Sequence, residues 1–171
     1  MGAAENESFH DFVLREQAGL LRLAILLAGD RGHAEDLVQI ALMKSYRHWA
    51  RISRSGTPSA YVRRVLVTSH TSWRRRLATT EQVMETLPER ADPAGMPDPE
   101  DEELRHALRS LPPRMRTALV LRFYEDLSEQ RTAELMGCSA STVNTQTARG
   151  LTRLRDALSV PAPRDRVREE Q

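Results

Sequence analysis

The middle of this 171-residue chain contains a segment that cannot take part in a packed core. Residues 78–100 hold four prolines and one glycine among many acidic side chains, a composition typical of linkers. The chain is therefore expected to form two small domains, over residues 8–77 and 101–158, followed by a disordered tail at 159–171. The flexible acidic linker between them could reach about 75 Å at roughly 3.3 Å per residue, so it could hold the domains well apart.

Both domains are predicted to be helical, which gives an all-α fold. Within the first domain, Tyr61 and Trp73 are expected in the core, while His70 is expected to share the opposite side of its helix with arginines. In the last helix, Gly150 either loosens the helix end or allows close packing. Apolar residues at helical spacing, together with caps and breakers, predict helices over residues 8–28, 33–49, 59–77, about 102–111, 113–124, 129–136 and 140–158, with a loop over residues 51–58.

Charge is strongly segregated along the chain, although the total is only +1. Residues 51–77 carry seven arginines and no acid, residues 78–103 have a net charge of −8, and residues 104–158 have a net charge of +4. Clustered basic side chains favour polyanions, because each neutralised phosphate releases counterions. A solvated helix face is the less favoured interpretation of residues 51–77, since no carboxylate balances their arginines.

Composition also argues against several classes of protein. The single cysteine, Cys138, excludes an internal disulfide framework and a multi-cysteine zinc site. The five histidines have no metal-ligand spacing, and no phosphate loop or nucleophile motif is present. We therefore expect no enzyme activity, metal, cofactor or small-molecule substrate. With no apolar run of about 20 residues and no secretion signal, the chain is expected to be cytoplasmic, without direct membrane insertion.

The strongest local motif predicts a helix-turn-helix near the C-terminus. Ala133 is small enough for two helices to cross, Gly137 tolerates the positive φ of the turn, and Val143 can point inward. A plain helical hairpin is the alternative, but the outer face of the second helix favours DNA binding in a major groove. That face carries Ser141, Thr142, Thr145, Gln146, Arg149 and Arg153.

Four motifs together resemble bacterial RNA polymerase sigma factors of the extracytoplasmic-function group, in the sigma-70 superfamily. The resemblance covers about residues 8–158. The sequences of the motifs are most similar to those of the sigma-E-like branch of high-GC bacteria. The motifs are the AEDLVQ sequence at 34–39, the stretch from 58–65 through 73–76, the LPPRMR sequence at 111–116, and the turn at 137–143.

The resemblance implies a role for each domain. Domain 8–77 would be sigma region 2, which binds core polymerase and the −10 element, and domain 101–158 would be region 4, which binds the −35 element. The clamp helices of the largest polymerase subunit would be gripped by Asp36, Leu37, Val38 and Gln39. The −10 DNA would be contacted by Arg51, Arg54, Arg63, Arg64, Arg74, Arg75 and Arg76, and the −35 DNA by the six outer-face residues of the last helix.

Further partners follow from the same resemblance. They are promoter DNA, the flap of the second-largest polymerase subunit, and an anti-sigma factor that holds the protein inactive. The sequence departs from the family pattern at Thr68, Ser72, Asn144 and Gln146, so the promoter preference stays open.

Two other functions are compatible with these residues. One is a stand-alone helix-turn-helix regulator whose first domain is a dimerisation bundle. The other is an interaction protein that occupies polymerase or an anti-sigma factor without driving transcription.

Overall fold

The computed structural model describes residues 7–79 and 99–159, and every regular element within them is a helix, as expected for an all-α fold. Residues 80–98 of the predicted linker and 160–171 of the predicted tail lie outside the described residues. The elements are α1 (Phe9–Ala28), α2 (Arg31–Tyr46), α3 (Trp49–Ile52), the 3₁₀ turn η1 (Ser53–Ser55), α4 (Pro58–Thr79), α5 (Pro99–Arg109), α6 (Pro113–Leu119), the π-helical turn η2 (Val120–Tyr124), α7 (Glu129–Met136) and α8 (Ala140–Ser159).

Local capping residues set the ends of the first helices. The Ser8 hydroxyl accepts a hydrogen bond from the Asp11 backbone N–H at the start of α1, and Gly29 ends this helix with φ of 74°. The Asp30 carboxylate caps α2 in the same way, accepting from the His33 N–H at 2.8 Å. The predicted loop at 51–58 is shorter than expected, because α3 and η1 continue helical turns through Ser55.

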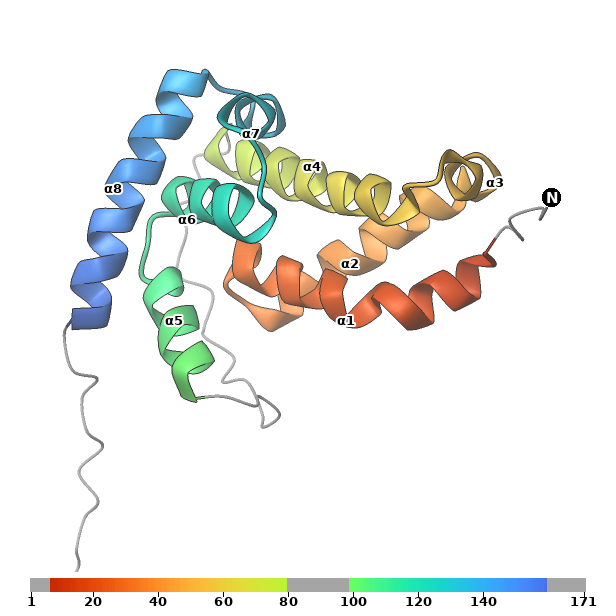
Figure 1. The fold of residues 1–171 in the computed structure, drawn as a ribbon, viewed down its shortest axis with the longest axis horizontal. Helices are drawn as coiled ribbons and strands as arrows, with labels where there is room; N and C mark the ends of the chain where they lie inside the picture. Colours follow the sequence, from red (N-terminus) through yellow and green to blue (C-terminus); the bar gives the residue numbers. More distant parts are fainter. Residues whose placement is uncertain (1–6, 80–98, 160–171) are drawn as a thin grey trace, which may run out of the picture.

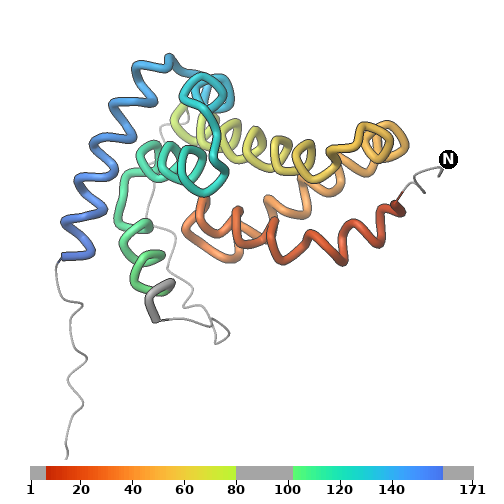
Figure 2. Tube along the Cα trace, in the orientation of Figure 1, coloured from red at the N-terminus to blue at the C-terminus, as the bar shows by residue number. Residues whose placement is uncertain are grey.

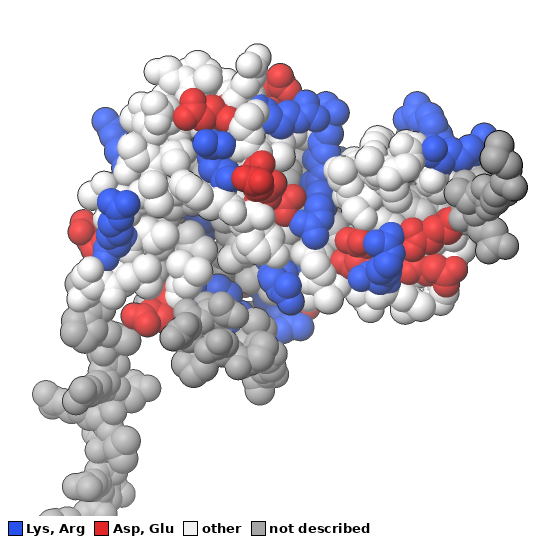
Figure 3. Space-filling model, in the orientation of Figure 1, with Lys and Arg blue, Asp and Glu red and all other residues white. Residues whose placement is uncertain are grey.

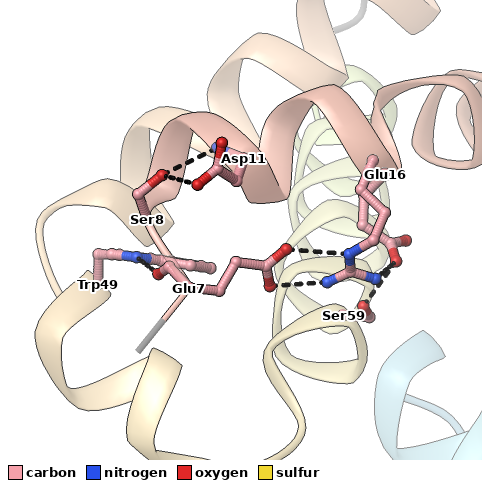
Figure 4. A network of polar contacts seen from close by, with 7 residues as sticks. Glu7, Ser8, Asp11, Glu16, Trp49 and Ser59 are labelled. Carbon is pink, nitrogen blue, oxygen red and sulfur yellow. Dashed lines mark hydrogen bonds and ion pairs between the residues drawn. The ribbon is translucent and has the colours of Figure 1, made fainter. Parts of the chain in front are cut away.

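A polar network fastens the start of α1 to α3 and α4 (Figure 4). The Trp49 indole N–H donates to the Glu7 backbone carbonyl at 3.1 Å, and both Glu7 carboxylate oxygens accept from Arg15 at 3.0 and 2.8 Å. Arg15 also pairs with Glu16, whose carboxylate accepts from the Ser59 hydroxyl at 2.9 Å. These contacts hold α3 and the beginning of α4 against α1.

The first module, which we define as α1 to α4, is a small bundle in which α1 and α4 both pack on α2 (Figure 1). Its interior is formed by fully buried side chains such as Phe12, Leu20 and Leu66. Tyr61 is half-buried and packs against this core, and the half-buried Trp73 ring lies 3.8 Å from the His33 ring. The expectation of a core position is met by Tyr61, whereas Trp73 lies at the edge, stacked on His33 and outside the apolar core clusters.

The second module, which we define as α5 to α8, contains the helix-turn-helix. Gly137 ends α7 with φ of 65°, Ala133 is buried where α7 meets α8, and Val143 is fully buried. A Cβ built on Gly150 would lie only 3.1 Å from a Leu119 methyl carbon. Of the two explanations for Gly150, close packing of α8 on α6 is therefore the one that fits.

The two modules lie directly against each other, which the sequence did not predict. Figure 2 shows α6 and α7 beside the C-terminal ends of α1 and α4. One cluster of buried residues runs from the first module, including Phe12 and Leu66, into the second, including Leu121 and Met136. The modules thus share one continuous apolar core, and in this state they do not stand apart.

His70 lies at this junction. It shares a side of its helix with Arg74, as expected, but that side is turned inward there and His70 is fully buried. Neither of its ring nitrogens has a hydrogen-bond partner within the described residues. Burial, reinforced by the positive charges of Arg74 and Arg116 and by His33, lowers the pKa of His70 from 6.5 to about 3. The ring is therefore neutral in the folded chain.

This burial makes stability dependent on pH. Below about pH 6.5 the unfolded chain binds a proton at His70, whereas the folded chain does not. The free energy of unfolding therefore has its full value above that pH and falls as the pH drops towards 3. The loss is expected to be at most about 1.4 kcal/mol per pH unit. Denaturant titrations of His70→Leu should show a flatter dependence on pH than the wild type. The exposed His10→Asn is the control, and an equally flat profile for it would contradict this origin.

Candidate nucleic-acid and polymerase interface

The outer face of α2 carries two of the four residues expected to bind polymerase. Asp36 and Gln39 are exposed, so their side chains can meet a partner. Leu37 and Val38 are only 1% and 8% exposed, and both belong to the core. The expectation that all four side chains contact polymerase therefore needs correction. Leu37 and Val38 pack α2 against the core, so only Asp36 and Gln39 are open to a partner.

Sequence reasoning missed two apolar residues on the same face of α2. Ile40 and Met43 are 42% and 66% exposed, unusually open for large apolar side chains. Together with Asp36 they follow the helical spacing of four and three residues. The available signal was that both residues fall outside the apolar stripe Ala34, Leu37, Val38 and Ala41 that faces the core.

The seven arginines expected to contact the −10 element are not equivalent. Arg63 pairs with Glu125 of the second module at 2.5 Å. Arg74 is half-buried with its guanidinium 5.3 Å from the Trp73 ring centroid, and burial lowers its pKa. The other five are exposed, namely Arg51 in α3, Arg54 in η1, and Arg64, Arg75 and Arg76 in α4.

The predicted −35 face lies on the side of α8 away from the core. Ser139 accepts a hydrogen bond from the Thr142 backbone N–H at 3.1 Å, which fixes the first turn of this helix. Val143 and Gly150 form its buried side, so the opposite side is open to a ligand. Of the predicted residues, Ser141, Thr145, Arg149 and Arg153 are exposed, and Thr142 and Gln146 are half-buried.

A basic cavity of about 510 Å³ lies between α4 and the second module. His70, Arg74 and Arg75 line it from α4, and Arg114 lines it from α6. None of the described residues that line it is acidic. Figure 3 shows basic side chains gathered along the boundary between the two lobes of the molecule.

Arg116 of α6 is buried next to this cavity. Burial, together with the nearby charges of Arg74 and Arg109, lowers its pKa to about 10, so it remains a cation at neutral pH. Its Nε donates to the Leu27 carbonyl of α1 at 3.1 Å. This contact could not be predicted from the residues near Arg116, because the partner is a backbone carbonyl 89 positions away.

Two other features, a metal site and a membrane-spanning helix, are not found in the described part of the chain. Its residues contain no group of His, Cys, Asp or Glu that could hold a metal ion. None of its helices is long and apolar enough to span a membrane.

Comparisons with known proteins identify both modules. Residues 12–80 match sigma-70 region 2, and residues 101–154 match sigma-70 region 4. A solved structure of the sigma factor RpoE from Bartonella quintana, in complex with the anti-sigma factor NepR, has the same fold, with a TM-score of 0.62. It is 24% identical, and the match covers 90% of this chain and 98% of that one.

Several curated proteins are similar over most of their length. The RNA polymerase sigma-E factor of Streptomyces coelicolor is 37% identical, over 88% of this chain and 85% of that protein. The sigma-E factor of Streptomyces avermitilis is 35% identical, over 92% and 89%. These matches span both modules, which leaves no place for a dimerisation bundle at the N-terminus. Sigma factors are transcription initiation factors and not a known enzyme family. This chain belongs to the sigma-70 family of RNA polymerase sigma factors, on its sigma-E-like, extracytoplasmic-function branch.

Proposed function

We propose that this chain is an alternative sigma factor that binds core RNA polymerase in the bacterial cytoplasm, reads the −10 and −35 elements of promoters and starts transcription. Residues 8–77 act as region 2 and residues 101–158 as region 4. Of the linker expected at residues 78–100, residues 78–79 continue α4 and residues 99–100 begin α5, so the connection between the helices is shorter than expected. The observation that carries the proposal is that one short chain presents two separate basic reading surfaces, on α3 to α4 and on α8.

The energetics of strand opening support a polymerase partner. Opening about ten base-pair steps costs on the order of 14 kcal/mol, since DNA stacking averages about 1.4 kcal/mol per step. A base trapped against an aromatic ring returns only about 1–3 kcal/mol, and aromatic residues make up 5% of this chain. The protein therefore depends on a larger enzyme to open DNA.

The polymerase contact is assigned to the outer face of α2. Asp36 and Gln39 supply the polar groups of this surface, and Ile40 and Met43 supply apolar area that water would otherwise cover. A polar residue beside exposed apolar side chains is a common arrangement at protein interfaces. The flap of the second-largest polymerase subunit is the partner of the second module.

Control by an anti-sigma factor is part of the same proposal. The structural relative RpoE was solved together with its anti-sigma factor NepR. The exposed apolar residues on α2 offer a surface that such an inhibitor could cover in competition with polymerase.

Reversing one charge on α2 tests the polymerase contact. Asp36→Arg should weaken binding to purified core polymerase by about tenfold or more, because it places a like or unmatched charge in an interface. Run-off transcription from the reconstituted holoenzyme should fall in parallel. The control is Asp156→Arg, an equal charge reversal at an exposed position near the end of α8. If wild-type protein failed to bind core polymerase, the sigma-factor function would be wrong.

The role of α8 can be tested separately. Arg149→Ala should weaken holoenzyme binding to promoters with an intact −35 element by about 5- to 150-fold, the range of about 1–3 kcal/mol for a good base contact. Promoters with a scrambled −35 element should be affected much less. Equal losses on both templates would make Arg149 a phosphate contact and not a base reader. Arg155→Ala, exposed in the last turns of α8, serves as the matched control.

A further inference from the structure

The cavity between α4 and the second module is bordered by nitrogen atoms that the protein leaves without hydrogen bonds. His70 is fully buried, and neither of its ring nitrogens has a partner within residues 7–79 and 99–159. The Nε of Arg74 is likewise buried and has no partner among the same residues. Both residues line the cavity. Because buried polar groups in folded proteins are nearly always hydrogen-bonded, these three nitrogens indicate that the cavity is built to receive a ligand.

The same cavity carries positive charge that no nearby carboxylate balances. Arg74 and Arg75 line it from α4 and Arg114 lines it from α6, and none of the three forms an ion pair with a described acidic residue. The buried Arg116 of α6 adds a fourth cation beside the cavity. Like charges gathered in a space partly shielded from water repel one another, and an anion bound among them would offset that repulsion.

The position of Arg75 depends on the turn of the helix-turn-helix. Its guanidinium lies so close to Gly137 that a Cβ on that glycine would be 2.5 Å from the Arg75 Nη2. The left-handed φ of 65° that ends α7 already favours glycine at this position, and the missing side chain leaves room for the guanidinium. Arg75 thus reaches from α4 to the end of α7, so that with Arg114 on α6 the cations approach the cavity from more than one direction.

The rest of the cavity lining is mostly apolar. Leu77 and Ala78 of α4, Pro113 of α6 and Met136 of α7 contribute to it. The volume of about 510 Å³ falls within the range of about 300–1,000 Å³ that is typical of small-molecule sites. An inorganic phosphate would contact the arginines but would leave this apolar lining to water. An organic molecule that also carries phosphates satisfies both parts, since adaptable side chains such as methionine pack well against flat rings.

We propose that this cavity binds an organic molecule with two or three phosphates, of the size of a nucleoside di- or triphosphate. The phosphates contact the guanidinium groups of Arg74, Arg75 and Arg114, which match the geometry of phosphate oxygens. The neutral ring of His70 donates one N–H to the same phosphates, and the organic part packs against the apolar lining. This ligand site goes beyond the proposed function and does not depend on the role of the chain in transcription.

Promoter DNA is the other source of phosphate groups for these arginines, because Arg74 and Arg75 are among the residues predicted to contact the −10 element. A duplex presents its phosphates to the outer surface of a protein. The Arg74 Nε and the ring nitrogens of His70 are instead buried, so a ligand that reaches them has to enter the cavity. A small molecule can do so, and we therefore favour it over DNA.

Isothermal titration calorimetry on the whole chain tests the site directly. Three probes are compared in a buffer with EDTA, which prevents magnesium from neutralising the phosphates: ATP, tripolyphosphate and adenosine. We expect ATP to bind once per chain and about tenfold more tightly than tripolyphosphate, because only ATP also buries an organic part. Adenosine alone should show no binding heat at the same concentrations. Equal affinities of ATP and tripolyphosphate, or no saturable binding of ATP, would overturn the proposal.

Removing one charge at a time locates the site. Arg75→Gln and Arg114→Gln should each weaken ATP binding by about tenfold or more, since each removes a charged hydrogen bond to a phosphate. Both positions are exposed, so both variants should keep the fold, which circular dichroism checks. The matched control is Arg155→Gln, which removes the same charge at an exposed position of α8 outside the cavity lining. An equal loss in the control would show attraction by net charge alone and would overturn the site, as would unchanged affinity in the first two variants.

The fluorescence of Trp73 gives a second readout at the site. The chain has two tryptophans, and the Arg74 guanidinium lies 5.3 Å from the centroid of the Trp73 ring. In a Trp49→Phe background, ATP should change the emission of Trp73 with the same half-saturation concentration as in calorimetry. Binding heat without any change in emission would place ATP elsewhere and contradict the proposal. Should Trp49→Phe unfold the chain, calorimetry on the arginine variants decides alone.

Competition with DNA separates the two sources of phosphate. A short duplex of unrelated sequence, supplied at the same phosphate concentration as ATP, should leave the Trp73 response to ATP largely unchanged. If the duplex displaced ATP and its own binding fell in Arg75→Gln and Arg114→Gln, the cavity would be a DNA-phosphate site and the proposal would be wrong. None of these measurements uses polymerase or a promoter, so a negative result would leave the proposed sigma-factor function standing.

Discussion

Burial of the Arg116 guanidinium against the C-terminal end of α1 determines how the two halves of this chain meet. A cation removed from water is costly unless acceptors replace its hydration, and here two helix-end carbonyls do so. Those carbonyls are available because Gly29 ends α1 in the left-handed conformation immediately afterwards. A capping glycine in one module and a single arginine in the other thus fix the relative position of α1 and α6, and with it the position of α7 on α4.

Each of the two proposed DNA-binding surfaces lies on a helix whose other side packs into the core. The two helices differ in how many of their predicted DNA-binding residues are also used in packing. On α8, a buried valine and a close-packed glycine on one side leave the opposite side exposed, where the −35 contacts are proposed. On α4, the same helix that carries five of the seven arginines predicted to contact −10 DNA also supplies Val67 and His70 to the shared core. The proposed −35 surface is therefore exposed in this structure, whereas the proposed −10 surface is partly engaged within the protein. This asymmetry follows from which side of each helix the core occupies.

Local features were predictable from sequence, and long-range ones were not. The boundaries of α7 at 129–136 and the positive φ of Gly137 follow from a serine cap and a glycine, because such signals act over a few residues. Leu37 and Val38 illustrate the limit of motif transfer: the motif lies on one helix, but only burial separates the residues that support its outer face from those that form it. The ion pair of Arg63 with Glu125 joins positions 62 residues apart, and nothing near either residue indicates the other.

The shared apolar core has a consequence for the lifetime of the protein in a cell. Leucine and methionine side chains that now cover one another across the junction would face water in an extended molecule without a partner. Such a molecule would be prone to self-association and to proteolysis. Docking of the two halves protects these side chains from both processes.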